Sequence, residues 1–242
     1  MRFPHQSKAS NGQFNFKGYK ALIITISQST LDKIDSETGE VLKVGKPTGV
    51  YASEMTEPYY VFSDAQMEVY LASIIGGRIP IDKLSMMPLI RTKYDIRLLK
   101  DDDFQQKVKK FESIAAIDMS NYDMFFLSGG WGAAYDFAQS EILSKRISEA
   151  YASGTVLAAV CHGPLGFIGA QKSDGSALVE NLKMTGVTNK QLKELMVGDT
   201  PKHLDSELRK GKALYERQRG LLDMFQSKVV VDEDHRIVTG QN

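Results

Sequence analysis

The chain has 242 residues, of which 42% are hydrophobic and 25% are charged. These proportions are typical of a globular protein, and a chain of this length can bury one sizeable core. The 30 basic and 30 acidic residues cancel to a formal net charge of zero, so no overall charge attracts nucleic acid or an anionic membrane. The composition therefore favours a protein that acts on small molecules or on other proteins, and we expect neither a nucleic-acid nor a membrane partner.

The cysteine count and the apolar runs bear on the compartment. Cys161 is the only cysteine, so no internal disulfide can form, which fits a reducing compartment. Residues 1–18 lack the apolar core of a signal peptide, and no segment approaches the roughly 20 apolar residues of a membrane span. We therefore expect a soluble, cytoplasmic protein. Residues 1–20 are expected to be an N-terminal extension that could be disordered, and residues 21–242 to be a single domain, because no linker or internal repeat divides them.

Short apolar runs alternate with amphipathic segments along the chain. In chain order, strands are expected at residues 21–27, 66–73, 122–127, 155–160, 182–187 and 228–231. Helices are expected from about Thr48, at residues 101–111 and 138–152, and, rich in small residues, at 163–170. Residues 28–46 are expected to be a long loop or small cap, residues 80–100 to be irregular, and residues 236–242 to contribute little. The alternation predicts an α/β fold, with a mostly parallel sheet between two layers of helices.

Two predicted strands run into turns of small residues. In such a fold the ligand site lies beyond the carboxyl ends of the strands, where both turns are placed. The strand at residues 122–127 is followed by SGGWG, residues 128–132. This run either offers a backbone N–H to an oxyanion or is a plain tight turn, and the two interpretations are about equally favoured. It is not expected to cradle a phosphate, because no Lys-Ser or Lys-Thr follows the glycines.

Cys161 is the candidate nucleophile. It lies in AAVCHGP, residues 158–164, where a strand turns directly into a helix and small residues leave room for a strained, exposed side chain. A cysteine at a strand end is more often a small buried hydrophobe, but the alanines before it and the Gly-Pro after it are not needed for packing. His162 follows directly and is of the residue type that best serves as a general base near neutral pH. A helix N-terminus and a nearby imidazolium would both lower the thiol pKa, so we expect Cys161 to alkylate with iodoacetamide at pH 6.

This elbow resembles that of the ThiJ/PfpI superfamily, whose fold is that of the class I glutamine amidotransferases. The motif AAVCHGP is the most specific match, and the most similar branch holds heat-shock chaperones and glutathione-independent glyoxalases. Further matches are TGVYASE (residues 48–54), ASIIGGRIPIDKLS (72–85), residues 127–136, TGVTN (185–189) and TGQN (239–242). The resemblance runs from residue 21 to the end of the sequence. It implies a flavodoxin-like three-layer α/β/α sandwich with a small cap or inserted loops.

The resemblance also implies roles for individual residues. Cys161 would be the nucleophile, His162 its base partner, and Glu54 the acid beside the thiol. Gly130 and the backbone of His162 match the positions of the oxyanion hole. A carboxylate next to a thiolate would repel its charge, so Glu54 is expected to be protonated and to donate a hydrogen bond.

One departure from the family pattern concerns a third residue. In the glyoxalase-like members, an acidic residue that orients the histidine follows the TGVTN segment by a few positions. Here Gln191 or Leu192 stands at that place, and Glu194 could serve only if the register shifts. Without an orienting carboxylate the imidazole is held less well in its productive tautomer, so we expect weak glyoxalase activity.

The function implied by the resemblance is that of an enzyme acting on small reactive aldehydes such as methylglyoxal, through a hemithioacetal at Cys161. Two alternatives stay open: an amidase or peptidase using the same nucleophile, and a non-enzymatic stress chaperone or thiol redox sensor. No cluster of residues has metal-ligand spacing, so we expect neither a metal nor an organic cofactor. Because superfamily members are commonly homodimers, and apolar residues gather within residues 80–100, we also expect a homodimer.

Overall fold

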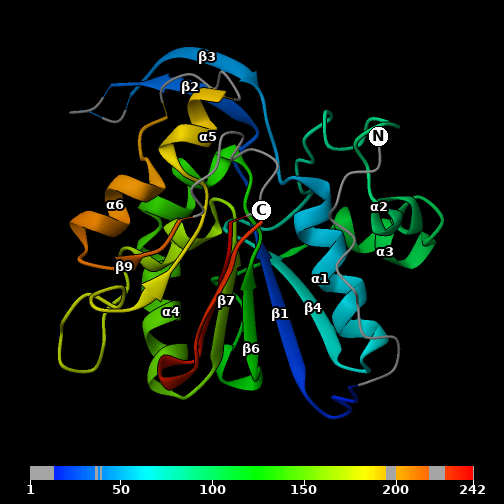
Figure 1. Cartoon of the computed structure of the whole chain (residues 1–242). Helices are drawn as coiled ribbons and strands as arrows, with labels where there is room; N and C mark the ends of the chain where they lie inside the picture. Colours follow the sequence, from blue (N-terminus) through cyan, green and yellow to red (C-terminus); the bar gives the residue numbers. More distant parts are fainter. Residues whose placement is uncertain (1–13, 36–37, 39, 195–199, 218–226, 242) are drawn as a thin grey trace.

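The computed structural model describes residues 14–35, 38, 40–194, 200–217 and 227–241, without the side chains of residues 192–194. The chain forms three layers, with a central sheet between helices (Figure 1). Helix α1 (Ala52–Asp64) packs on strands β1 (Lys20–Thr25) and β4 (Glu68–Ser73), and helix α4 (Glu141–Ala152) covers the opposite face (Figure 1). The expected flavodoxin-like three-layer α/β/α fold is confirmed.

The central sheet has seven strands in the order β10-β11-β7-β6-β1-β4-β5. The strands not yet placed are β5 (Glu112–Ser113), β6 (Met124–Leu127), β7 (Val156–Val160), β10 (Val229–Asp232) and β11 (Ile237–Gly240). All neighbouring strands run parallel except β10 and β11, which are antiparallel. A parallel strand covered on both faces must be apolar throughout, which explains why β1 reads KALIIT and is buried along almost its whole length.

Short helices complete the two outer layers. They are α2 (Lys93–Leu98), α3 (Asp102–Val108), α5 (Asn189–Glu194) and α6 (Leu204–Lys210). The expectation that residues 80–100 are irregular is wrong where α2 forms, because Thr92 and Asp95 make a reciprocal capping box that starts this helix. Over the ranges that the structure describes, no helix is both long enough and apolar enough to cross a bilayer.

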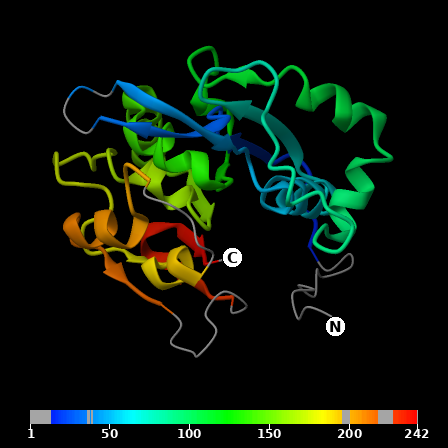
Figure 2. The ribbon, with the colours of Figure 1, turned by 90° about the horizontal axis from the view of Figure 1, so that it is seen from above.

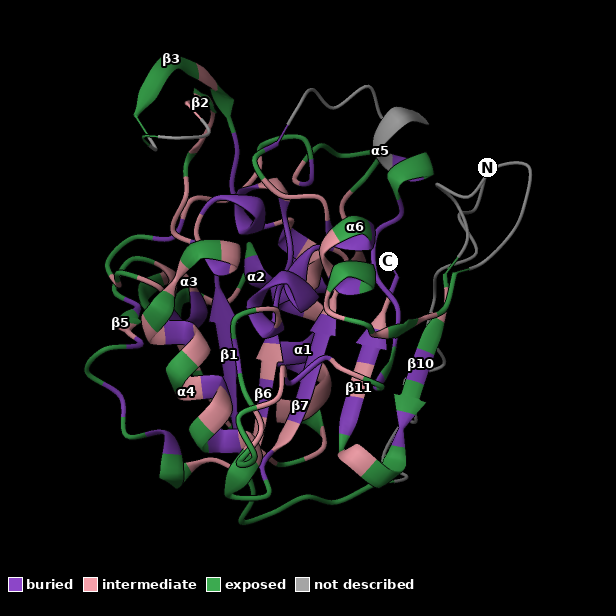
Figure 3. Ribbon diagram, turned by 90° about the vertical axis from the view of Figure 1, so that its left-hand side faces the viewer, coloured by how far each residue is buried: buried purple, intermediate pink, exposed green. Residues whose placement is uncertain are grey.

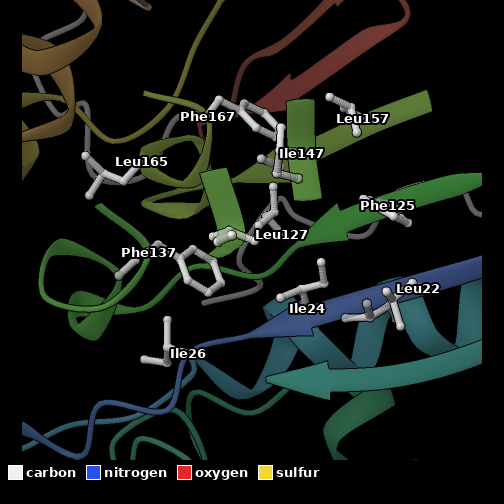
Figure 4. Packing of buried hydrophobic residues seen from close by; sticks show 14 of the residues in the cluster. Leu22, Ile24, Ile26, Phe125, Leu127, Phe137, Ile147, Leu157, Leu165 and Phe167 are labelled. Carbon is white, nitrogen blue, oxygen red and sulfur yellow. The ribbon is translucent and has the colours of Figure 1, made fainter. Parts of the chain in front are cut away.

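The packing is close directly behind the ends of β6 and β7. A side chain at Gly166 would stand 3.0 Å from carbon atoms of both Leu127 and Leu143, and 3.6 Å from Phe137. All three of these side chains are buried, and Figure 4 shows Leu127 and Phe137 facing the same region as Leu165 and Phe167. Figure 3 shows buried central strands and a largely exposed β3, whereas β10 at the sheet edge alternates exposed and buried residues. The turns at the strand ends therefore rest on a close-packed base.

The described part of residues 28–46 forms two paired strands rather than a long loop, which agrees with the small cap that was the other expectation. Strands β2 (Thr30–Ile34) and β3 (Val41–Pro47) pair antiparallel in a separate two-stranded sheet that lies over the end of the central sheet (Figures 1 and 2). The hairpin is tied to the body by Tyr135, whose hydroxyl donates to the Asp32 carbonyl at 2.8 Å. The sequence pattern failed here because β3 is exposed on both faces and so shows no alternation of apolar and polar residues.

The end of the chain also differs from expectation. Residues 237–240 form β11, which lies between β7 and β10, with Ile237 and Thr239 fully buried. A four-residue strand is too short for periodicity to distinguish it from coil. The strand expected at residues 182–187 is only β8 (Lys183–Met184), which pairs with β9 (Leu214–Tyr215) outside the central sheet. The helix expected at residues 163–170 is a 3-10 helix, η4 (Gly163–Phe167).

Candidate active site

The site lies where two neighbouring parallel strands end. Strands β6 and β7 pair in register from Met124–Val156 to Leu127–Ala159, so their carboxyl ends leave the sheet side by side. The SGGWG turn follows β6, and Cys161 with His162 follows β7. The expectation that both small-residue turns meet at this edge of the sheet is confirmed.

The backbone at Cys161 adopts the left-handed conformation, with φ at +58°. This conformation costs a non-glycine residue about 1–2 kcal/mol, so surrounding contacts must hold it. The Cys161 N–H donates to the carbonyl of Gly240 at 2.9 Å, and the Val187 N–H donates to the Cys161 carbonyl at 2.9 Å. The elbow is thus pinned on one side by the end of β11 and on the other by the segment after β8.

Two glycines let the turns approach each other backbone to backbone. A Cβ on Gly163 would overlap the carbonyl oxygen of Leu127, and a Cβ on Gly129 would stand 2.8 Å from the backbone nitrogen of His162. Gly130 has a φ of +111°, which only glycine adopts readily. Only glycine fits at these positions, and the small residues of both motifs are explained by this close approach.

The thiol of Cys161 lies beside an imidazole and two backbone N–H groups, which are the groups that reactions at a carbonyl carbon need. Its Sγ lies 3.3 Å from Nδ1 of His162. The backbone N–H groups of His162 and Gly130 also contact it, and both lower the pKa of the thiol. These are the two backbone groups expected to form the oxyanion hole, and the structure brings them together at the sulfur.

Glu54 approaches the thiol from the first turn of α1. Its backbone carbonyl accepts a hydrogen bond from the Ser128 hydroxyl at 2.9 Å, which ties this turn of the helix to the end of β6. The carboxyl oxygen Oε2 lies so close to Gly129 that a Cβ there would be 2.5 Å away. Burial raises the pKa of Glu54 to about 8, while hydrogen bonds from the Cys161 thiol and the Gly129 N–H act in the opposite direction. Glu54 is therefore a neutral acid at neutral pH.

The expected low pKa of Cys161 is not found. Burial raises the pKa of the thiol well above its ordinary range, and the negative charge that Glu54 can carry raises it further. Burial also lowers the pKa of His162 to about 3, so no imidazolium is present to stabilise a thiolate. The helix after the elbow is a single 3-10 segment of five residues, which supplies little dipole. We conclude that the thiol rests neutral beside a neutral base and a neutral acid.

This arrangement predicts how alkylation depends on pH. The iodoacetamide labelling rate of Cys161 should rise with a midpoint above the model thiol pKa of about 8.5, and Glu54→Gln should move that midpoint down because it removes a nearby negative charge. The measurement is the rate of mass increase of the intact protein between pH 6 and 10. Glu40→Gln, an exposed residue of the hairpin, is the matched control and should leave the midpoint unchanged. A wild-type midpoint below pH 7.5 would contradict the neutral-thiol state.

Of the three candidates for the residue that orients His162, the structure describes the side chain of Gln191. Gln191 is buried, and its Oε1 accepts a hydrogen bond from the Thr188 N–H at 2.9 Å while its own N–H bonds the Thr188 hydroxyl at 3.1 Å. Gln191 therefore takes part in capping α5. The side chains of Leu192 and Glu194 lie outside the described residues, so their relation to His162 stays a prediction.

Three residues near the site were not singled out from the sequence. Trp131 lies against the His162 ring, with ring centroids 4.7 Å apart. Burial raises the pKa of Tyr51 to about 12, and the charges of Glu54 and of Cys161 contribute, which places Tyr51 near both. Burial is the main cause of the low pKa of His162, and the charge of His203 lowers that pKa further. A second imidazole therefore lies near the site. Trp131 sits inside the SGGWG run and could have been suspected, whereas His203 carries no local signal.

The comparisons with known proteins agree with this geometry. A sequence model of the DJ-1/PfpI family matches residues 44–242. The chain belongs to the DJ-1/PfpI family. Within the part of the chain that the structure describes, no group of three or more His, Cys, Asp or Glu side chains is arranged to hold a metal ion.

Two curated relatives and two solved structures resemble this chain over most of its length. Glyoxalase 3 of Candida albicans is 31% identical over 206 residues, covering 82% of this chain and 85% of that protein. The glutathione-independent glyoxalase HSP31 of Saccharomyces cerevisiae is 33% identical over 168 residues, 68% of each chain. Among structures, Rapid Encystment Protein 24 kDa of Francisella tularensis has a TM-score of 0.79 at 28% identity, covering 93% and 92% of the two chains. Glyoxalase III of Candida albicans has a TM-score of 0.78 at 28% identity, covering 93% and 91%.

Proposed function

We propose that this protein is a cysteine-dependent enzyme that converts small reactive aldehydes of the methylglyoxal type to 2-hydroxy acids without glutathione. The observation that carries the proposal is the meeting of a thiol, a neutral imidazole and a protonated carboxyl group at one strand end, within reach of two backbone N–H groups. The glyoxalase names of the relatives favour this activity over the amidase, peptidase, chaperone and redox-sensor alternatives.

The first step is the addition of the thiol to the aldehyde. His162 Nδ1 takes the proton of Cys161 while Sγ forms a bond to the aldehyde carbon. Negative charge develops on the former carbonyl oxygen, and the N–H groups of Gly130 and His162 stabilise it. The proton held by His162 then passes to this oxygen. The result is a neutral hemithioacetal and a neutral imidazole, so no charged residue is required at rest.

The second step moves a hydrogen between the two carbon atoms. A base removes the hydrogen of the sulfur-bearing carbon, the released electron pair forms an enediol with the neighbouring carbonyl, and a proton returns to that neighbour. The product is a thioester of a 2-hydroxy acid. Glu54 and His162 are the groups that hold or move these protons. Water then breaks the carbon–sulfur bond and the thiol regains its proton. One carbon is oxidised and its neighbour reduced, so water is the only co-reactant.

The test is formation of lactate from methylglyoxal by the wild-type protein in buffer free of glutathione and other thiols. We expect measurable but slow turnover, because a carboxylate that orients the histidine is missing at the family position. Lactate is assayed enzymatically, and loss of methylglyoxal is followed separately so that simple trapping by the thiol is not counted. Removal of methylglyoxal in one stoichiometric burst, with no lactate, would refute the activity and favour the sensor alternative.

We further propose that residues 21–242 act as a single domain in the cytoplasm and that the protein is a homodimer. Support for the dimer is the apolar patch of the loop before α2, where Leu84 is 64%, Met87 46%, Leu89 87% and Ile90 44% exposed. Neither nucleic acid nor membrane is proposed as a partner.

The dimer leads to a prediction about mass in solution. Light scattering at micromolar concentration should give twice the chain mass of 26.9 kDa, and Leu89→Lys should shift the protein toward monomer by placing a charge in the apolar patch. Ile75→Lys is the matched control, because Ile75 is 75% exposed outside the patch. A wild-type monomer, or equal dissociation by both variants, would contradict the proposed interface.

A further inference from the structure

Nδ1 of His203 is a buried ring nitrogen. Among the described residues, its Nδ1 has no hydrogen-bond partner although it is shielded from solvent. A buried polar atom left unpaired is destabilising, and such atoms in native proteins are usually satisfied by protein or ordered water. His203 is half-buried and is the N-cap residue of helix α6.

The start of α6 packs against the nucleophile elbow. A Cβ on Gly186 would overlap the side chain of Leu204 on one side and stand 2.8 Å from the Cys161 carbonyl on the other. Gly186 therefore lies between Leu204 and the elbow, and its lack of a side chain allows the two to approach each other. The electrostatic effect of His203 on His162 agrees with this placement. Among the described residues, no direct hydrogen bond joins the two imidazoles.

The chemistry of the elbow requires one tautomer of His162. Because Nδ1 faces the Cys161 thiol at 3.3 Å and must accept its proton, the ring proton has to reside on Nε2. In a catalytic histidine this state is normally held by an acceptor on the second ring nitrogen. Gln191 stands in the segment where such an acceptor is expected, but its Oε1 already accepts from the Thr188 N–H. The buried Nδ1 of His203 is a second candidate acceptor near the elbow.

We propose that His203 is the positioning residue of His162: its Nδ1 accepts, through one bridging water, the hydrogen bond of the Nε2–H of His162. This contact satisfies the orphan nitrogen of His203 and keeps Nδ1 of His162 free for the thiol proton. A water-bridged imidazole holds the tautomer less firmly than a carboxylate does, which is consistent with slow turnover. The expected effect of His203 on the reaction rate rests on the proposed function. The tautomer of His162 can be measured without turnover.

The experiment compares His203→Leu with His203→Gln. Leucine removes the acceptor, whereas the side-chain oxygen of glutamine can restore it. Nitrogen-15 shifts of the His162 ring, assigned with a His162→Gln variant, should show the Nε2–H tautomer in the wild type, a mixture in His203→Leu and mostly Nε2–H in His203→Gln. The kcat for lactate formation should fall about 10–100-fold in His203→Leu with KM little changed, and recover in His203→Gln.

The control is His235→Gln, because the His235 ring pairs with Asp232 at 2.7 Å at the β10–β11 turn, away from the elbow. It should leave the spectrum of His162 and the kcat unchanged. If His203→Leu does not fold, His203→Phe, which keeps a planar ring without a nitrogen, takes its place. An unchanged His162 tautomer in the folded apolar variant would overturn the proposal. The two conclusions can also fail separately. If the wild type forms no lactate but the His162 tautomer still depends on His203, the proposed function is wrong and this inference stands.

Discussion

Replacing Cys161 with serine is expected to lower lactate formation from methylglyoxal by at least about 10⁴-fold. Removing the nucleophile of a serine protease costs about 10⁶-fold in kcat, which sets the scale for a reaction that passes through a covalent adduct. The hydroxyl of serine is a far weaker nucleophile than a thiol, and the neutral His162 is too weak a base to ionise it. Because Cys161 is the only cysteine, no other thiol can replace it.

The fold should survive this substitution. Serine is close to cysteine in volume, and the hydrogen bonds that pin the elbow use only the backbone of residue 161. The thermal midpoint and the far-ultraviolet circular dichroism should therefore match those of the wild type, and His235→Gln serves as the catalytic control. Equal lactate formation by wild type and Cys161→Ser would refute the proposed reaction. A holdase activity that persists in Cys161→Ser, without lactate formation by the wild type, would identify the chaperone alternative as correct.

The second large effect is expected from Glu54→Gln, which keeps the shape of the side chain and removes its proton-transfer capacity. General acid–base catalysis contributes about 10²–10⁴-fold, so kcat should fall within that range. In the wild type, kcat should also fall as the pH rises through about 8, because Glu54 is then deprotonated. That descending limb should be absent from the residual activity of Glu54→Gln. The measurement is kcat against pH from 5 to 9 for both proteins.

The same carboxyl group makes the free energy of unfolding depend on pH. Its pKa is raised from 4.5 to about 8 by folding, so the folded state holds its proton more tightly than the unfolded state does. The stabilisation by the neutral acid is complete below about pH 4.5 and is lost as the pH rises to about 8. Between pH 5 and 8 the wild type should lose up to about 4 kcal/mol relative to Glu54→Gln.

Urea unfolding of both proteins at pH 5 and pH 8 checks this result, because groups remote from residue 54 titrate equally in both and cancel. The Cys161 thiol, whose pKa Glu54 affects, stays protonated over this range because its pKa is raised well above its ordinary value. Glu40→Gln, which changes an exposed carboxylate, should follow the wild type at both pH values. A loss of stability that is the same in wild type and Glu54→Gln would show that Glu54 is ionised in the folded protein. The neutral-acid role in the mechanism would then be wrong as well.

The sequence by itself determined where Cys161 stands. The run ALIIT and the alanines before Cys161 predicted buried strands, because such runs are short, apolar and have no polar face to expose. The glycines after β6 and β7 then predicted two turns at the carboxyl ends of strands, and the structure brings these turns into close contact. These features depend on residues that are neighbours in the chain, which is why local patterns and a family motif were enough to predict them.

Only the tertiary structure decided the chemical state of the site. The pKa values of Cys161, His162 and Glu54 depend on how completely segments from α1, β6, β7 and β11 exclude water, and no local pattern reports that. The strand β11 was missed because it is short and polar at its end, and the hairpin of β2 and β3 because β3 is exposed on both faces and shows no alternation. His203 likewise lies far from His162 along the chain and comes near the elbow only because the start of α6 packs against it. Burial and long-range contact set the proton positions, and both arise only when the chain is folded.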